Sequence, residues 1–202
     1  MAFALAQTPG PVEEFGEVAS MGMELIASPY KTKEYGGFYT ESEAARAMIE
    51  LLEGNITFWP YMALVDAFQH WVYENPDQSS NAAKSEEKWA ELWDRFIIGI
   101  DYSGWENMKK TYWHRQSHIF GAPFYYIEYG LALLGAAQVW ANARKDQQKA
   151  VAEYRKALAL GATVPLPDLF AVAGAKFAFD AQTLKEAVDL MEEVIGEMEA
   201  KL

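Results

Sequence analysis

The sequence contains no cysteine and only three histidines, His70, His114 and His118. Without cysteine the chain forms neither a disulfide framework nor a thiolate metal site, so a zinc ion would need His, Asp or Glu ligands. A chain without cysteine also suits a reducing compartment, and we expect a cytoplasmic protein. The opening residues, MAFALAQTPGP, lack the basic region of a signal peptide and are broken by Pro9, Gly10 and Pro11, so we expect no leader.

Positive charge is also scarce, with 17 Lys and Arg against 29 Asp and Glu and a net charge of -12. An acidic chain of this kind is repelled by phosphate backbones and by anionic lipid surfaces, which argues against nucleic-acid or membrane partners. No apolar stretch reaches the roughly 20 residues that a membrane-spanning helix needs. What the sequence does have is a large apolar content, 51%, and many aromatic residues, which helical cores and peptide-binding clefts both use.

Apolar residues recur mostly at three- and four-residue spacing, without a sustained alternating pattern, and this predicts an all-α fold. At 202 residues we expect a single helical domain covering residues 1–202. Thr40 and Glu43 match the capping box that starts a helix. The segment DQSSNAAKSE (residues 77–86) is polar and is interpreted as an exposed loop. The predicted helices run from after Pro11 to about residue 27, from 41 to about 54, over 56–73, from about residue 87 to 100–104, and over 123–144, 146–161 and 180–198, with a short one within 165–174.

His114 and His118 are four residues apart, which on one helix would place both imidazoles on the same face. The residues between them, Arg115, Gln116 and Ser117, include no glutamate that could act as a general base. We therefore favour hydrogen bonding at a helix junction over a self-contained metal site built from this pair and an acidic residue. His70 lies in an apolar helix and is expected to be a hydrogen-bonded core histidine.

Three tyrosines, Tyr125, Tyr126 and Tyr129, follow a Gly-Pro break within HIFGAPFYYIEY. Phenols that face a cleft can donate hydrogen bonds to a developing oxyanion, and His118 one turn upstream could bind a peptide carbonyl. From spacing alone, a buried core with hydrogen-bonded hydroxyls is the stronger interpretation.

Several segments of the sequence also resemble signatures of a known protein family. HIFGAPFYYIEYGLALLGAAQVW is similar to H-I-x-x-x-P-F-Y-Y-I-[DE]-Y-G-x-A, the signature of oligoendopeptidase F and thimet-oligopeptidase-like zinc metallopeptidases. EFGEVASMGMEL resembles the E-[VI]-A-S-M-x-M-E segment of the same family, and VDAFQHWVYENP and KWAELWDRF resemble its connecting helices. The resemblance covers nearly the whole chain, in the family's order, and implies the helical C-terminal part of the catalytic domain.

The resemblance assigns Glu17 to the position of the third zinc ligand, in a site of two histidines, one glutamate and a water. It implies that Ser20 and Glu24, on nearly the same helix face, lie around the metal ligands. For Glu24 an equally strong interpretation is that its carboxylate merely satisfies a buried helix.

The resemblance also assigns substrate contacts. It implies that His118, Tyr126 and Tyr129 hold the substrate backbone and stabilise the tetrahedral intermediate, with Tyr125 as a further substrate contact. The expected substrate is an oligopeptide.

One feature of the family is missing from this chain. No H-E-x-x-H occurs in the 202 residues, although in the family that helix precedes the glutamate segment and supplies two ligands and the general base. MAFALAQ resembles sequence that lies shortly after that motif, so we expect a truncated product or a split subunit. The complete enzyme should hold zinc; this chain alone should bind none stably and should be inactive.

The alternative from another class is a non-catalytic helical module that binds peptides or proteins. A chain that supplies H-E-x-x-H is a possible partner. Because truncation would expose apolar surface, we also expect a homo-oligomer, most simply a dimer, through the face bearing the first helix and the aromatic segment.

Overall fold

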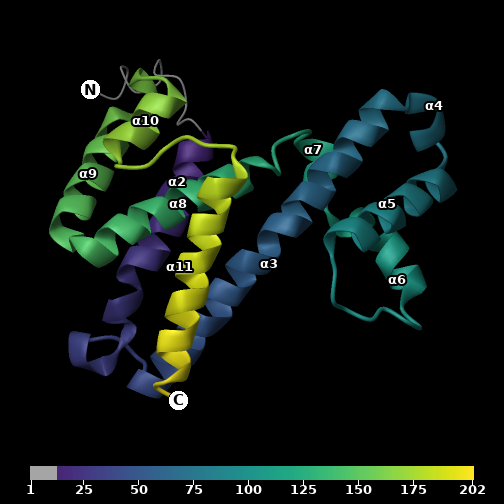
Figure 1. Cartoon of the computed structure of the whole chain (residues 1–202). Helices are drawn as coiled ribbons and strands as arrows, with labels where there is room; N and C mark the ends of the chain where they lie inside the picture. The colour runs from purple at the N-terminus through teal and green to yellow at the C-terminus, as the bar shows by residue number, and fades with distance from the viewer. Residues whose placement is uncertain (1–12) are drawn as a thin grey trace. The chain divides into compact units, whose positions relative to one another are not determined.

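The structure, a computed structural model, describes residues 13–202 (Figure 1). This part of the chain is helical and holds no strand, apart from an isolated bridge between Thr32 and Tyr39, which confirms the all-α prediction. None of its helices is long and apolar enough to cross a membrane. The chain divides into two compact units: residues up to Ile56 with Leu131–Leu202, and Thr57–Gly130. The expectation of one domain over residues 1–202 stays a prediction, and the start of the first helix at Pro11 lies outside the described residues.

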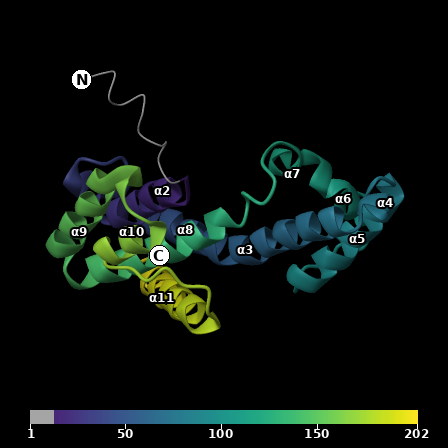
Figure 2. The same cartoon turned by 90° about the horizontal axis from the view of Figure 1, so that it is seen from above.

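The first unit contains a buried apolar cluster to which α2 contributes. Figures 1 and 2 both show α2, α8, α9 and α10 side by side in this unit. Phe15 and Val18, three residues apart on α2, enter the cluster, and the Tyr154 hydroxyl on α9 donates to the Ala19 carbonyl at 2.6 Å. The elements are α2 (Glu13–Ala27), η1 (Ser28–Lys31), η2 (Lys33–Tyr35), the start of α3 (Glu41–Glu74), most of α8 (Glu128–Lys145), α9 (Gln147–Leu160), η4 (Gly161–Thr163), α10 (Leu166–Val172) and α11 (Ala181–Glu199).

The second unit has a core of aromatic rings. Phe68 of α3 and Trp89 of α5 are fully buried and meet edge to face, with ring centroids 5.1 Å apart. Trp89, Leu92 and Trp93 are buried on one face of α5. The elements are the rest of α3, α4 (Pro76–Ser79), α5 (Ala82–Phe96), α6 (Glu106–Thr111), η3 (Tyr112–Arg115) and α7 (Ser117–Gly121).

Helix α3 starts as predicted but does not end where the sequence suggested. The Thr40 backbone N–H donates to the Glu43 carboxylate at 2.8 Å, and the Glu43 N–H donates back to the Thr40 hydroxyl at 3.3 Å, which confirms the capping box. The predicted break at Gly54 is wrong, because one helix of 34 residues continues through Gly54 and Pro60. Burial of Leu52 and Met62 on either side offsets the helix penalties of glycine and proline.

The segment at residues 77–86 is exposed over most of its length, as expected, but it is largely helical instead of forming a loop. Its polar side chains cap and close the helices. The Asn81 side chain accepts hydrogen bonds from the backbone of Ala83 and Lys84 and so starts α5. Ser85 is buried, and its hydroxyl donates to the Ser79 carbonyl at 3.0 Å.

Helix α8 begins at Glu128, later than the predicted start at Pro123. The delay has a local cause, since Phe124 adopts a left-handed backbone conformation with φ of 63° that a helix does not tolerate. The Phe124 ring lies against His70 and Tyr73, with centroids 4.9 and 5.0 Å away. These ring contacts hold a strained residue that would otherwise relax.

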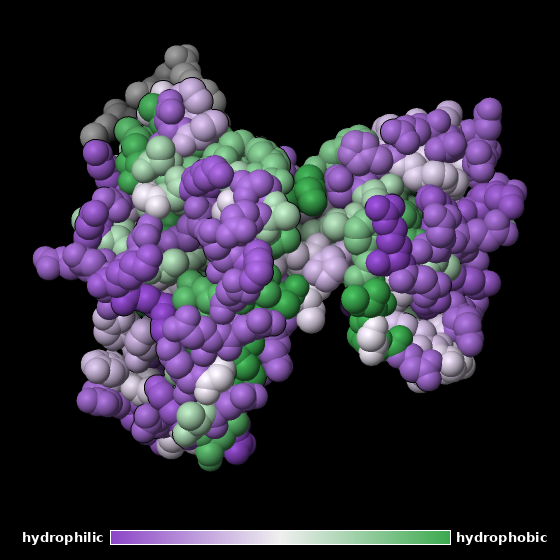
Figure 3. All heavy atoms as spheres, in the orientation of Figure 1, coloured by the Kyte–Doolittle hydropathy of each residue, from purple (hydrophilic) through white to green (hydrophobic). Residues whose placement is uncertain are grey.

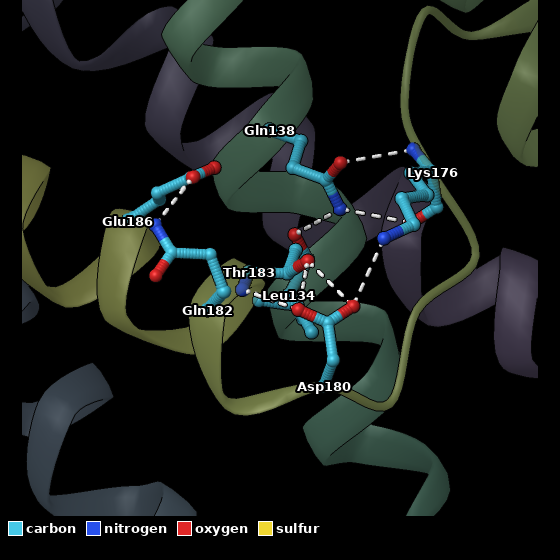
Figure 4. A network of polar contacts seen from close by, with 7 residues as sticks. All are labelled: Leu134, Gln138, Lys176, Asp180, Gln182, Thr183 and Glu186. Atoms are coloured by element: carbon cyan, nitrogen blue, oxygen red, sulfur yellow. Dashed lines mark hydrogen bonds and ion pairs between the residues drawn. The ribbon is translucent and has the colours of Figure 1, made fainter.

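A polar network joins α8 to the segment that precedes α11 (Figure 4). The Gln138 amide donates to the carbonyl of Lys176 at 3.0 Å and accepts from its N–H at 2.9 Å. Asp180 caps α11 by accepting from the Thr183 N–H at 2.9 Å and from the Lys176 ammonium at 2.9 Å. The Thr183 N–H foremost, then the Lys176 ammonium and the Thr183 hydroxyl, lower the pKa of Asp180 to about 2.

This cap should give the chain a defined acid sensitivity. Because the folded-state pKa of Asp180 is depressed, its stabilisation is complete above its unfolded-state pKa and disappears between about pH 4 and pH 2. Asp180→Asn, which can still cap, should flatten the loss of thermal stability over this range. Asp189→Asn, on the exposed face of the same helix, is the matched control and should not. Equal acid dependence in both variants would contradict the assignment.

Candidate functional site

The histidine and tyrosines singled out by the resemblance lie together in the second unit. His118 sits in α7, Tyr125 and Tyr126 in the turn that follows, and Tyr129 in the first turn of α8. The His118 ring is stacked on Tyr125 with centroids 6.2 Å apart and meets Tyr126 and Tyr129 edge to face at 5.0 and 5.7 Å. The Tyr129 hydroxyl is 3.3 Å from His118 Nε2. The turn held by Phe124 thus folds the tyrosines back over the histidine.

A second pair of residues completes this cluster and was not foreseen from the sequence. The Tyr61 hydroxyl donates to Gln116 Oε1 at 3.1 Å, and Gln116 Nε2 lies 2.7 Å from His118 Nδ1. In the sequence, Gln116 is only one of the three residues between His114 and His118. Tyr61 is 55 positions away on α3, and no local pattern links it to His118.

Two phenols of this cluster, Tyr61 and Tyr126, are kept protonated. Tyr126 is 7% exposed, and burial, followed by the neighbouring Tyr129 and Tyr112, raises its pKa to about 12, with a hydrogen bond to Gln116 acting in the opposite direction. Burial also raises the pKa of Tyr61. Near neutral pH these hydroxyls therefore carry their protons and serve as hydrogen-bond donors.

The four-residue spacing of His114 and His118 does not produce a shared helix face. His114 lies in η3 and is exposed beside the Trp113 ring, whereas His118 lies in the next helix, which starts at Ser117 after the non-helical residue Gln116. Within residues 13–202 no three His, Asp or Glu side chains gather where they could hold a metal ion. Zinc sites use three or four protein ligands, so the described residues do not by themselves fit zinc.

The core role expected for His70 is wrong. Its side chain is 58% exposed, and Nε2 faces the Asp66 carboxylate of the same helix at 3.5 Å. The buried position on this part of α3 belongs to the neighbouring residue, Gln69, which is 1% exposed.

Glu17 lies in the first unit, half-buried on α2. The Ser20 hydroxyl donates to the Glu17 carbonyl at 3.0 Å and lies 3.4 Å from its carboxylate, and the place of both residues around a metal ion stays a prediction. Glu24 is exposed, so the interpretation that it satisfies a buried helix is wrong. Glu17 and Glu24 can supply carboxylate oxygens at a surface, while His118 and the tyrosines supply donors in the other unit.

Large apolar side chains are exposed in both units, and Figure 3 shows hydrophobic surface interspersed with hydrophilic surface on the face it draws. Phe38 is 91% exposed in the first unit and Ile98 is 79% exposed in the second. Self-association through apolar surface stays a prediction.

Three solved structures resemble the chain over nearly all of its length. PZ peptidase A, solved with an inhibitor, matches with a TM-score of 0.80 and 28% identity over 95% of this chain and 32% of its own. A protein assigned as oligoendopeptidase F matches with a TM-score of 0.81 and 30% identity over 93% of this chain and 32% of its own. An oligoendopeptidase F assigned in Bacillus anthracis str. Ames matches with a TM-score of 0.72 and 26% identity, over 96% and 30%.

The chain spans about a third of the length of these structures. No curated protein matches its sequence. The fold and these likenesses relate the chain to one part of these peptidase structures. The sequence model of peptidase family M3 matches residues 4–189, and the chain belongs to this family.

Proposed function

We propose that the chain is part of a zinc metallopeptidase that cleaves oligopeptides, and that it supplies one zinc ligand and the donors that hold the substrate backbone. Glu17 is the ligand, with Ser20 hydrogen-bonded to it and Glu24 nearby on the same helix. His118, Tyr126 and Tyr129 are the substrate contacts, with Tyr125 stacked on His118. Zinc in such a site activates a water molecule for attack on a peptide carbonyl.

The observation that carries the proposal is the His118 cluster. The rings of Tyr126 and Tyr129 meet the His118 ring edge to face, with centroids 5.0 and 5.7 Å away, so the three side chains lie close together. Both phenols can donate a proton, and burial raises the pKa of Tyr126 to about 12, so it stays a neutral donor. Preorganised donors of this kind stabilise the charge that develops on a peptide oxygen.

These 202 residues contain no H-E-x-x-H and therefore no glutamate in the position of the family's general base. We propose that they do not hydrolyse peptides by themselves, and that zinc is held only together with residues they do not contain. The same cluster also favours the second candidate, a non-catalytic module that binds extended peptides through His118, Tyr126 and Tyr129.

Peptide binding to the chain tests the role of the tyrosines. A short fluorescent oligopeptide should bind, and Tyr126→Phe combined with Tyr129→Phe should weaken binding about tenfold, because two hydrogen bonds are lost while both rings remain. Tyr73→Phe is the matched control, since Tyr73 is 58% exposed in the same unit and its ring contact with Phe124 is retained. An affinity unchanged by the double substitution would refute the proposed contacts.

A further inference from the structure

We propose that Gln116 and Tyr61 are positioning residues that fix His118 as the tautomer with its proton on Nε2, and thereby direct the Tyr129 hydroxyl proton toward substrate. The tautomer follows from the cluster's own geometry. The last link, from Tyr129 to substrate, rests on the function proposed above.

The argument starts at Tyr61, whose hydroxyl is partly buried among rings. Its ring packs edge to face against Trp89, Trp93 and Tyr126, with centroids 6.5, 6.3 and 6.0 Å away. Burial raises the pKa of this phenol, so the oxygen keeps its proton and needs an acceptor. Gln116 Oε1 at 3.1 Å supplies that acceptor, which turns the amide nitrogen of Gln116 the other way.

The amide nitrogen then faces His118. Gln116 Nε2 lies 2.7 Å from His118 Nδ1, and an amide nitrogen has only protons to offer. Nδ1 must therefore accept, and a neutral imidazole that accepts at Nδ1 carries its proton on Nε2. If the amide were reversed, Gln116 Oε1 would face His118 Nδ1, and Nδ1 would carry the proton. The Tyr61 hydroxyl would then need another acceptor for its own proton.

The Nε2 proton has a partner of its own, the Tyr129 oxygen at 3.3 Å. When this oxygen accepts from His118, the proton of the Tyr129 hydroxyl is left to donate elsewhere. The four groups thus form a hydrogen-bond chain with one direction, from Tyr61 through Gln116 and His118 to Tyr129, in which each donor polarises the next. Its open end is a phenol proton, suited to the carbonyl oxygen of a peptide.

The tautomer is directly measurable in the 202-residue chain by two-bond ¹⁵N–¹H correlation of the imidazoles, at a pH where His118 is neutral. His70 and His114 report in the same spectrum as internal references. We expect the Nε2–H form of His118 to dominate. Gln116→Leu should lower the ratio of Nε2–H to Nδ1–H at least about fivefold, because the hydrogen bond that selects between them is gone.

Gln116→Glu is the second, sharper variant, since a carboxylate only accepts and so requires a proton on Nδ1. It should convert His118 to a form protonated at Nδ1 while leaving a polar side chain in place. Tyr61→Phe frees the amide to reverse and should bring the two tautomers toward equal populations. Gln182→Leu, at an exposed glutamine that bonds Glu186 on α11, is the control and should leave His118 unchanged.

Two results would overturn the proposal: an Nδ1–H tautomer in the unsubstituted chain, or a His118 tautomer unaffected by both Gln116 substitutions while circular dichroism shows the variants folded. Peptide titration separates this inference from the proposed function. A tautomer that behaves as expected, with peptide affinity insensitive to Tyr129→Phe, removes the substrate contact and leaves the tautomer assignment. If Tyr129→Phe weakens peptide binding but His118 carries its proton on Nδ1, the substrate contact stands and the tautomer assignment is removed.

Discussion

Mixing the chain with a polypeptide that carries the H-E-x-x-H helix of a family M3 peptidase should produce zinc binding and peptide hydrolysis that neither polypeptide shows alone. Glu17 would add the third protein ligand to the two histidines of that helix, and three ligands are what a catalytic zinc site requires. The measurements are the zinc content of the mixture after dialysis and the cleavage of a quenched fluorescent oligopeptide. The expected effect is large because neither polypeptide alone is expected to cleave the peptide.

Substitutions of glutamate in the mixture show whether Glu17 is responsible. Glu17→Gln should weaken zinc binding at least about a hundredfold, since even residues that only support a ligand account for 10- to 100-fold. Glu192→Gln, at an exposed glutamate of α11, should change nothing. Zinc and activity that appear equally with Glu17→Gln would remove Glu17 from the site, and a mixture that stays inactive would remove the split-enzyme form of the proposal.

Gly135→Ala should lower the free energy of unfolding by about 1–3 kcal/mol, and Phe170→Ala by about 3–5 kcal/mol. Gly135 is buried on α8, and a Cβ there would lie 2.5 Å from the Phe170 ring and 3.2 Å from Val18. Phe170 is 2% exposed and meets Phe15 and Phe177 edge to face, so its removal leaves a cavity in the first unit. Urea unfolding followed by circular dichroism measures both values.

A double substitution makes this prediction specific. With Phe170→Ala already present, the ring that opposes the new methyl group is gone, so Gly135→Ala should cost less than it does alone. Gly54→Ala is the control: a Cβ at Gly54 meets nothing within 4 Å, and in a continuous helix it should stabilise by about 0.5–1 kcal/mol. Additive costs for the pair, or destabilisation by Gly54→Ala, would contradict the packing described here.

Local signals predicted much of the fold. The Thr40–Glu43 capping box and the helix that starts at residue 180 depend on residues close in sequence, and the structure has both. The structure is helical at Gly54 and over most of residues 77–86, where the sequence predicted a break and a loop. Helix propensity and polarity are weak signals that burial and capping override. The delayed start of α8 depends on one residue, Phe124, whose left-handed conformation is held by rings from α3.

Only part of the candidate site could be predicted from the sequence, and that part came from the family resemblance and not from the spacing of residues. Resemblance to a known signature named Glu17, His118 and the tyrosines, whereas spacing alone favoured a buried aromatic core. Neither route reached Gln116 and Tyr61, because their role depends on a contact between residues 55 positions apart. The roles of all these residues in binding zinc and peptide stay predictions.

The way the units divide along the sequence sets an order for synthesis on the ribosome. The second unit is one continuous stretch, Thr57–Gly130, and all its parts are available once Gly130 has been made. The first unit is made of two stretches, and α2 finds partners such as Tyr154, which bonds Ala19 from 135 positions later, only after the second unit has been made. Until then these partners do not cover the apolar face of α2, which leaves this helix open to chaperones and to aggregation.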